Sequence, residues 1–261
     1  PKSILPSVVP SSGDLAIADP KYFQGNSIPI TSIIGDQQSS LFGQFCWDYG
    51  DLKATYGTGA FLLMNTGKKI IRTKKGLLTT ISWNINGQVE YALEGSVFSA
   101  GSAITWLKDK MKLIKTSKEI DILASKTHDN GGVYFVPAFT GLGAPHWNSS
   151  ARATFQGITI ENNNSHIARA ILESIAFQCN DVVQLMSKET NRKIHNFVVD
   201  GGVSQSDILL QFQADITNID IKRTETFEST ALGAAYLSGL AVKFWNSMDE
   251  LQIRKTPQKQ F

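Results

Sequence analysis

The stretch ATYGTGAFLLMNTG, at residues 54–67, predicts two β-strands joined by a tight turn. Apolar and β-branched residues stand on both sides of Gly57–Gly59, and glycine adopts the backbone angles of a sharp turn at no steric cost. Two further strands are predicted over 77–83 and 88–93, because the Asn-Gly pair between them favours a two-residue hairpin. This part of the chain is therefore expected to form antiparallel sheet.

Outside these hairpins, predicted strands alternate with predicted helices, an order that is typical of an α/β fold with a mixed sheet. Residues 1–30 are rich in Pro and Ser and predict an irregular lead-in segment, residues 31–245 are expected to form one domain, and residues 246–261 a polar, frayed tail. Gly233 and Gly239 leave room for close packing of the last helix. The apolar spacing predicts helices from Asp36 and over 96–114, 117–126, 165–188, 205–216 and 229–244, strands over 31–34, 133–139, 153–159 and 219–222, and a strand running into a turn over 197–202.

The composition excludes several classes of protein. The 261 residues carry 25 Lys and Arg against 23 Asp and Glu, a net charge of +2, and 42% of them are hydrophobic, which excludes a disordered chain and a strongly basic nucleic-acid binder. The basic cluster at 68–75 has no interleaved aromatic residues and is interpreted as a solvated hairpin surface. No apolar run approaches the ~20 residues that span a bilayer, so no membrane span is predicted and a cytoplasmic location is expected.

The cysteines and histidines do not have the spacing of a metal site. The two cysteines, Cys46 and Cys179, lie in apolar periodic segments and are expected to be small buried residues. The four histidines are scattered and have neither an i, i+4 partner nor a nearby cysteine pair. No metal-binding cluster is therefore predicted.

Two glycine turns at strand ends are candidates for binding a phosphate or a nucleotide. They are Gly57–Gly59 and the Asp-Gly-Gly turn at 200–202, which leads into a helix. Exposed backbone N–H groups at such turns bind anions, and the missing Cβ lets a ligand approach closely. Glycine after a strand is nevertheless most often explained by turn geometry alone. Neither turn matches the dinucleotide-binding or the P-loop pattern, which disfavours those folds. Gly101 is predicted to lie inside a helix, where glycine costs about 1 kcal/mol relative to alanine unless something passes close by.

Asp36 directly follows an apolar strand and opens a helix, which gives it two compatible interpretations. In the first, its side chain is the N-cap of the helix and accepts a hydrogen bond from a backbone N–H two or three residues later. In the second, it is a general base at the carboxyl end of a strand, where α/β sheets place their sites. A carboxylate there can take the proton of a substrate hydroxyl as a phosphoryl group arrives.

Five longer stretches carry a family resemblance: GDQQSSLFGQ at 35–44, ATYGTGAFLLMNTG at 54–67, YALEGSVFSAGSAITWLKD at 91–109, VYFVPAFTGLGAPHW at 133–147 and TALGAAYLSGLAVKFW at 230–245. Together they resemble the glycerol kinase branch of the FGGY carbohydrate kinases, over nearly the whole chain. The resemblance implies a ribonuclease H-like (actin-like ATPase) lobe with a mixed sheet flanked by helices. It also implies an enzyme that transfers the γ-phosphoryl of ATP to a terminal hydroxyl of glycerol.

The resemblance assigns substrate roles to three residues. Asp36 would take the proton from the terminal hydroxyl of glycerol, Gln37 would hydrogen-bond a neighbouring hydroxyl, and Phe61 would pack on the carbon skeleton. Catalysis would then consist of positioning and of charge neutralisation by Mg²⁺.

The same resemblance assigns the nucleotide, ATP or ADP, to another set of residues. Thr58 would face the β- and γ-phosphates, Gly101 would let the nucleotide pass over its helix, and Gly202 would lie against the adenosine. Thr105 stands where the family usually has glutamine and Ser206 where it has asparagine. Both are expected on the adenosine side, where they weaken or rearrange the contacts.

The Asp-x-Gly-Thr/Ser phosphate turn of the family's first lobe does not occur in this sequence. The sequence is therefore interpreted as the C-terminal lobe, with the N-terminal lobe of the same protein as its partner, a homo-oligomer as the expected full-length assembly, and no activity of the lobe alone. Two alternatives stay open at this point. One is a kinase for another polyol or a ketose, and the other is a non-catalytic actin-like lobe that binds nucleotide.

Overall fold

The computed structural model of the chain describes residues 1–73, 75–225, 228–252 and 258–261. In these residues one large sheet contains nine strands in the order β11-β10-β9-β3-β4-β6-β5-β1-β2, and a small second sheet pairs β7 with β8. The strands of the large sheet are β1 Ser12–Ile17, β2 Pro29–Ser32, β3 Leu52–Tyr56, β4 Ala60–Gly67, β5 Leu78–Ile85, β6 Gln88–Val97, β9 Phe197–Asp200, β10 Ile221–Thr224 and β11 Gln258–Gln260. Those of the small sheet are β7 Tyr134–Val136 and β8 Thr154–Gln156.

The large sheet is mixed, as predicted. Neighbouring strands in the series β3, β4, β6 and β5 pair antiparallel, with β3–β4 and β5–β6 as hairpins, whereas β9 pairs parallel with both β3 and β10. The parallel pairs need helical connections, because strands that run in one direction must be joined by a crossover. The α/β class with a mixed sheet is therefore confirmed.

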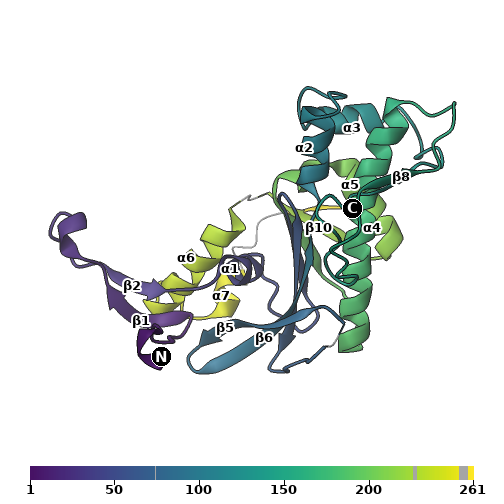
Figure 1. Cartoon of the computed structure of the whole chain (residues 1–261). Coiled ribbons are helices and arrows are strands. Elements are labelled where there is room, and N and C mark those ends of the chain that lie inside the picture. Colours follow the sequence, from purple (N-terminus) through teal and green to yellow (C-terminus); the bar gives the residue numbers. More distant parts are fainter. Residues whose placement is uncertain (74, 226–227, 253–257) are drawn as a thin grey trace.

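Helices cover both faces of this sheet. Figure 1 shows the long helix α4 along one side of the strands, and α1 and α6 next to each other on the other side. In the described part of the chain, none of the helices is both long and apolar enough to cross a membrane. The helices are α1 Asp36–Gly43, α2 Gly101–Asp109, α3 Glu119–Ala124, α4 Asn164–Thr190, α5 Asp207–Thr217, α6 Ser229–Ala241 and α7 Met248–Gln252, with short 3-10 turns η1 Lys2–Ile4, η2 Pro20–Tyr22 and η3 Gly202–Gln205.

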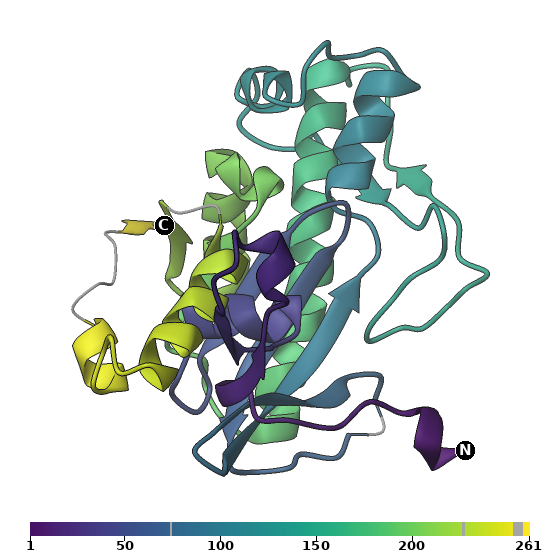
Figure 2. The same cartoon turned by 90° about the vertical axis from the view of Figure 1, so that its left-hand side faces the viewer.

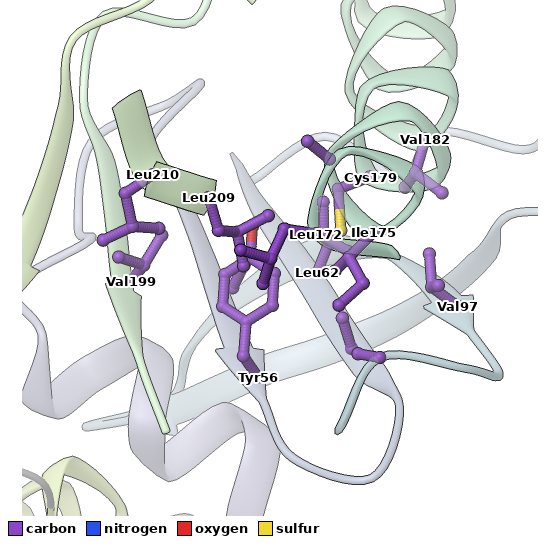
Figure 3. Packing of buried hydrophobic residues seen from close by; sticks show 14 of the residues in the cluster. Tyr56, Leu62, Val97, Leu172, Ile175, Cys179, Val182, Val199, Leu209 and Leu210 are labelled. Carbon is purple, nitrogen blue, oxygen red and sulfur yellow. The ribbon is translucent and has the colours of Figure 1, made fainter. Parts of the chain in front are cut away.

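The alternation of side chains along each strand creates two separate cores. Leu52, Ala54 and Tyr56 of β3 point to the α4 side, where they join the larger core with residues of α4 and α5. Figure 3 shows part of this core, with Tyr56 of β3 near Leu209 and Leu210 of α5, and with Cys179 of α4. Both Cys46 and Cys179 are buried, as predicted. The smaller core lies on the other face and contains residues of α1 and α6.

Helices α1 and α6 approach each other through their backbones. A Cβ atom added to Gly233 of α6 would lie 1.8 Å from the carbonyl oxygen of Ser39, and one added to Gly43 of α1 would lie 2.2 Å from the carbonyl oxygen of Ser229. No side chain fits at either position. The predicted close packing of the last helix at Gly233 is therefore present, and it fixes the position of α1 and of the residue that opens it, Asp36.

The structure corrects three expectations about local structure. Residues 1–30 were expected to be irregular, but they contain β1, whose Ser12 is buried and donates to the carbonyl oxygen of Leu237 at 2.7 Å. Tertiary contact with α6 thus stabilises a strand in a Pro- and Ser-rich segment. Strand β1 pairs antiparallel with β2, and this hairpin faces the viewer in Figure 2. Strand β6 extends to Val97, so the helix predicted over 96–114 is shorter and begins at Gly101.

The third correction concerns the C-terminal tail. Residues 246–261 were expected to be frayed, but they contain α7 and β11, which pairs antiparallel with β10. Residues 253–257 of this tail lie outside the described residues. The proposed domain limits at residues 31 and 245 stay predictions.

Candidate active site

A cavity of about 830 Å³ opens where the turn between β3 and β4 meets the start of α2 and the 3-10 turn η3. It gathers all five residues predicted to bind nucleotide, although they come from three separate parts of the chain. Those residues are Thr58, Gly101, Thr105, Gly202 and Ser206, and the wall also contains Ser117, Lys118, Asp121 and Gln205.

The β3–β4 turn is held by the first residues of α2. Backbone N–H groups of Ala100 and Ser102 donate to the carbonyl oxygen of Thr58 at 2.9 and 3.0 Å, and that of Gly101 donates to the carbonyl oxygen of Gly57 at 3.0 Å. A Cβ at Gly101 would lie 2.6 Å from the same Gly57 oxygen. The expectation that Gly101 sits inside a helix is wrong, because it is the first residue of α2. Contact with the turn is a structural reason for glycine there, independent of any nucleotide.

Ser206 has two structural partners at the edge of the cavity. It is the N-cap of α5, where its Oγ accepts from the N–H of Leu209 at 3.1 Å, and the same hydroxyl donates to Oδ1 of Asp121. Burial raises the pKa of Asp121, and the hydrogen bond from Ser206 opposes this increase. The Asp121–Ser206 pair therefore forms a polar edge on the wall to which the adenosine contacts are assigned. Thr105, on α2, is exposed and lines the same wall.

The second group of predicted residues lies on the α1 face of the sheet. Phe61 is 38% exposed and pairs with Thr55 of β3 and Ser96 of β6, so these three side chains point to one face. Asp36 is exposed at the first position of α1, and its Oδ1 accepts from the backbone N–H of Gln37 at 2.7 Å. The N-cap interpretation of Asp36 is wrong, because Gly35 occupies the N-cap position. The carboxylate of Asp36 is not engaged as a helix cap.

A buried lysine lies beneath these residues. Lys53 of β3 is fully buried, and its Nζ donates to Oε1 of Gln37 and to Oγ1 of Thr55, the latter at 3.0 Å. Burial lowers the pKa of Lys53 to about 8, against the opposing effect of the nearby carboxylates of Asp200, Glu94 and Asp36. The pKa of Glu94 is raised by burial and by Asp36, and the charge of Lys53 opposes this.

Comparison with known proteins gives the family. Residues 52–242 match the model of the FGGY family of carbohydrate kinases, C-terminal domain. The chain belongs to this family. The glycerol kinase of Carboxydothermus hydrogenoformans is 51% identical over 261 residues, covering 100% of this chain and 52% of that protein. That of Dichelobacter nodosus is 51% identical over 251 residues, covering 96% of this chain and 50% of that protein.

A solved structure of an FGGY kinase has the same fold. The crystal structure of Plasmodium falciparum glycerol kinase with ADP superposes with a TM-score of 0.93 at 42% identity, covering 99% of this chain and 52% of that one. The predicted actin-like lobe, flanked by helices, is thereby confirmed. This chain spans about half the length of the curated relatives that it matches.

The FGGY lobe offers carboxylates that fit Mg²⁺. Asp200 is buried, its Oδ2 accepts from the hydroxyls of Ser229 and of Ser40, the latter at 3.3 Å, and its Oδ1 has no hydrogen-bond partner among the described residues. Ser40 lies one helical turn after Asp36 on α1, so its contact with Asp200 joins the end of β9 to this helix. Within the described ranges, no group of three or more His, Cys, Asp or Glu could hold a metal ion. Mg²⁺ commonly uses one or two carboxylates together with water and phosphate oxygens, and this donor set fits that pattern.

Lys53 and Glu94 also belong to this site, although no motif in the sequence marks them. The signal was the alternation along β3, in which Lys53 and Thr55 stand between residues of the large core. A lysine in a strand whose two faces are both covered must be compensated by nearby charges and hydrogen bonds. The strand order, which the sequence alone does not give, is needed to show that Glu94 and Asp200 lie near Lys53.

Lys53 also makes the stability of this FGGY lobe depend on pH. The pKa of this lysine falls from 10.5 to about 8 on folding, so between these values the unfolded chain binds a proton that the folded chain does not. The free energy of unfolding therefore rises with pH in this window. Below about pH 8 the folded chain carries the full unfavourable free energy of the buried Lys53 charge. We expect the unmodified chain to gain about 2 kcal/mol relative to Lys53→Met between about pH 7.5 and 9.5. Urea unfolding of both proteins at both pH values measures this gain. The prediction is contradicted if the free energies of unfolding of the two proteins differ by the same amount at both pH values.

Proposed function

We propose that the chain is the C-terminal half of an ATP-dependent glycerol kinase, which transfers the γ-phosphoryl of ATP to a terminal hydroxyl of glycerol. One observation carries the proposal: a single β3–β4 turn joins the cavity lined by Thr58 and Gly202 to the sheet face that presents Phe61. The 51% identity to a glycerol kinase over the whole chain favours glycerol over other alcohols.

In this mechanism the two surfaces bring the donor and the acceptor together. The nucleotide occupies the cavity, with Gly202 against the adenosine and Thr58 at the phosphates. Glycerol lies on the sheet face, where Phe61 packs on its carbons and Gln37 binds one hydroxyl. Asp36 takes the proton of the attacking hydroxyl as the new P–O bond forms. When bound, Mg²⁺ would neutralise negative charge on the phosphoryl oxygens, and Oδ1 of Asp200 would hold it together with phosphate oxygens and water.

Calorimetric titration of MgADP into the chain tests the nucleotide half of this proposal. No atom lies within 4 Å of a Cβ added to Gly202, which lines the cavity, so we expect the side chain of Gly202→Leu to occupy cavity space. We expect the unmodified chain to bind MgADP and Gly202→Leu to bind it at least about tenfold more weakly, a loss of about 1.4 kcal/mol.

Urea unfolding of the variant is the control for this titration. Gly202→Leu must unfold at the same urea concentration as the unmodified chain, which shows that the side chain acts on the ligand rather than on the fold. Equal affinity of the two proteins would contradict the assignment of this cavity to the nucleotide.

The isolated chain is proposed to be inactive, and its catalytic partner is the N-terminal lobe. Phosphorylation of glycerol by this chain alone, above the level of an Asp36→Ala control, would overturn this part. Fusing the chain to the N-terminal half of the Carboxydothermus hydrogenoformans kinase supplies the other lobe. In that fusion, glycerol should be a better substrate than xylulose or erythritol, because a site that pairs each hydroxyl rejects other hydroxyl patterns.

A further inference from the structure

Lys53 constrains the side chain of Gln37, whose predicted role is to bind a hydroxyl of the substrate. A lysine ammonium has three donors and no acceptor. The atom of Gln37 that meets Nζ of Lys53 must therefore be the carbonyl oxygen Oε1, as the structure places it. The two N–H donors on Nε2 then point elsewhere. Among the described residues, Nε2 of Gln37 has no hydrogen-bond partner.

The neighbouring glutamine does not share this arrangement. The Nε2 of Gln38 donates to Oγ1 of Thr80 on β5 at 3.2 Å, so its amide already has a partner within the fold. Of the two glutamines, Gln37 alone accepts a hydrogen bond from the buried Lys53 and keeps the N–H donors of its amide without a partner among the described residues. Gln37 is also adjacent to Asp36, the proposed base.

Lys53 itself has little freedom to move. It is fully buried on β3, and Oγ1 of Thr55 accepts a second hydrogen bond from its Nζ at 3.0 Å. Strand register puts Lys53 opposite Leu63 of β4, which in turn lies opposite Glu94 of β6, and puts Thr55 opposite Asp200 of β9. A buried ammonium must keep such partners, because leaving it unpaired costs several kcal/mol.

We propose that Lys53 is a positioning residue for substrate recognition. It holds Oε1 of Gln37, so that Nε2 presents its N–H donors to a hydroxyl oxygen of the alcohol beside Asp36. The inference rests on the proposed function and extends it. Gln37 can recognise only a substrate atom that accepts a hydrogen bond. Lys53 imposes this requirement without touching the substrate, because it occupies Oε1 of Gln37.

A double-mutant cycle tests the inference in the fusion of this chain with the N-terminal half of the Carboxydothermus hydrogenoformans kinase. The variants are Lys53→Met, Gln37→Ala and the double variant, and the exposed Lys126→Met is the matched control. We expect each single change to raise KM for glycerol about tenfold with a smaller effect on kcat, the double variant to be no worse than Gln37→Ala, and the control to be unchanged.

The outcomes separate the two proposals. An unmodified fusion that does not phosphorylate glycerol overturns both the proposed function and this inference. An active fusion in which Lys53→Met leaves KM unchanged, or in which the two effects multiply in the double variant, overturns only the inference. Unchanged MgADP affinity in each variant shows that the lobe is folded.

A second measurement decides the question if Lys53→Met does not fold. The titratable groups around Lys53 are Asp200, Cys46, Glu94 and Asp36. A neutral amine can also accept a hydrogen bond and so no longer dictates which amide atom faces it. KM for glycerol should therefore rise with pH through about 8 in the unmodified fusion and stay level in Gln37→Ala. A level profile in the unmodified fusion, or the same rise in both proteins, overturns the inference.

Discussion

Asp36→Asn is expected to lower kcat for glycerol phosphorylation by about 100- to 10,000-fold, the usual contribution of a general base. Asparagine has the same shape but cannot take the proton of the attacking hydroxyl. The change leaves the fold intact, because the N-cap of α1 is Gly35. The one hydrogen bond that the Asp36 side chain makes with the described residues, from the N–H of Gln37, can also be accepted by an amide oxygen. Initial rates in the fusion with the N-terminal half measure the effect.

The control for this substitution is another exposed aspartate. Asp14 lies on β1 and is exposed, so Asp14→Asn makes the same chemical change away from the site. We expect it to retain full activity, and both variants to bind MgADP as the unmodified protein does. A loss of less than about tenfold in Asp36→Asn would show that this carboxylate is not the base.

Gly233→Ala is expected to lower the free energy of unfolding by about 3 kcal/mol, as overpacking does. In an unobstructed helix the same change stabilises by about 1 kcal/mol, because alanine is the better helix former. Here the new methyl group would lie 1.8 Å from the carbonyl oxygen of Ser39 and 2.8 Å from its Oγ, so α1 and α6 must move apart. The steric effect is the larger one and reverses the sign.

Urea unfolding tests this prediction by comparing Gly233→Ala with a second glycine variant of the same chain. Gly202→Ala adds the same methyl group where no atom lies within 4 Å, and its stability should change by less than about 1 kcal/mol. Equal stabilities of Gly202→Ala and Gly233→Ala would show that α1 and α6 adjust without cost. In the fusion, Gly233→Ala should also impair turnover, since α1 carries Asp36.

The sequence was sufficient for elements whose signals are local. The hairpin of β5 and β6 follows from one Asn-Gly pair, and the long helix α4 from its apolar period. Elements stabilised by distant contacts were not predictable in this way. Strand β1 depends on the hydrogen bond from Ser12 to α6, more than two hundred residues away, and the start of α2 depends on the turn at Gly57.

The same division applies to the candidate site. Asp36, Thr58 and Gly202 stand beside recognisable turns, and the structure brings Thr58 and Gly202 to one cavity. No local sequence motif identifies Lys53 and Glu94 as site residues, because only the order of the strands brings them close together. Hydrophobic spacing predicts that β3 is a strand, but only the strand order β9-β3-β4-β6 shows that a lysine within it is surrounded by carboxylates.

The short β3–β4 turn lets the two surfaces vary independently. Main-chain hydrogen bonds from Ala100, Gly101 and Ser102 fix its carbonyl groups, and none of these bonds depends on a side chain. Under the proposed function, substitutions on β4 and β6 would alter which alcohol is accepted, while substitutions on α3 and α5 would alter the cavity assigned to the nucleotide. The distance between donor and acceptor stays the same in either case. A lobe built in this way can acquire new substrates through changes on one face and keep its phosphoryl donor.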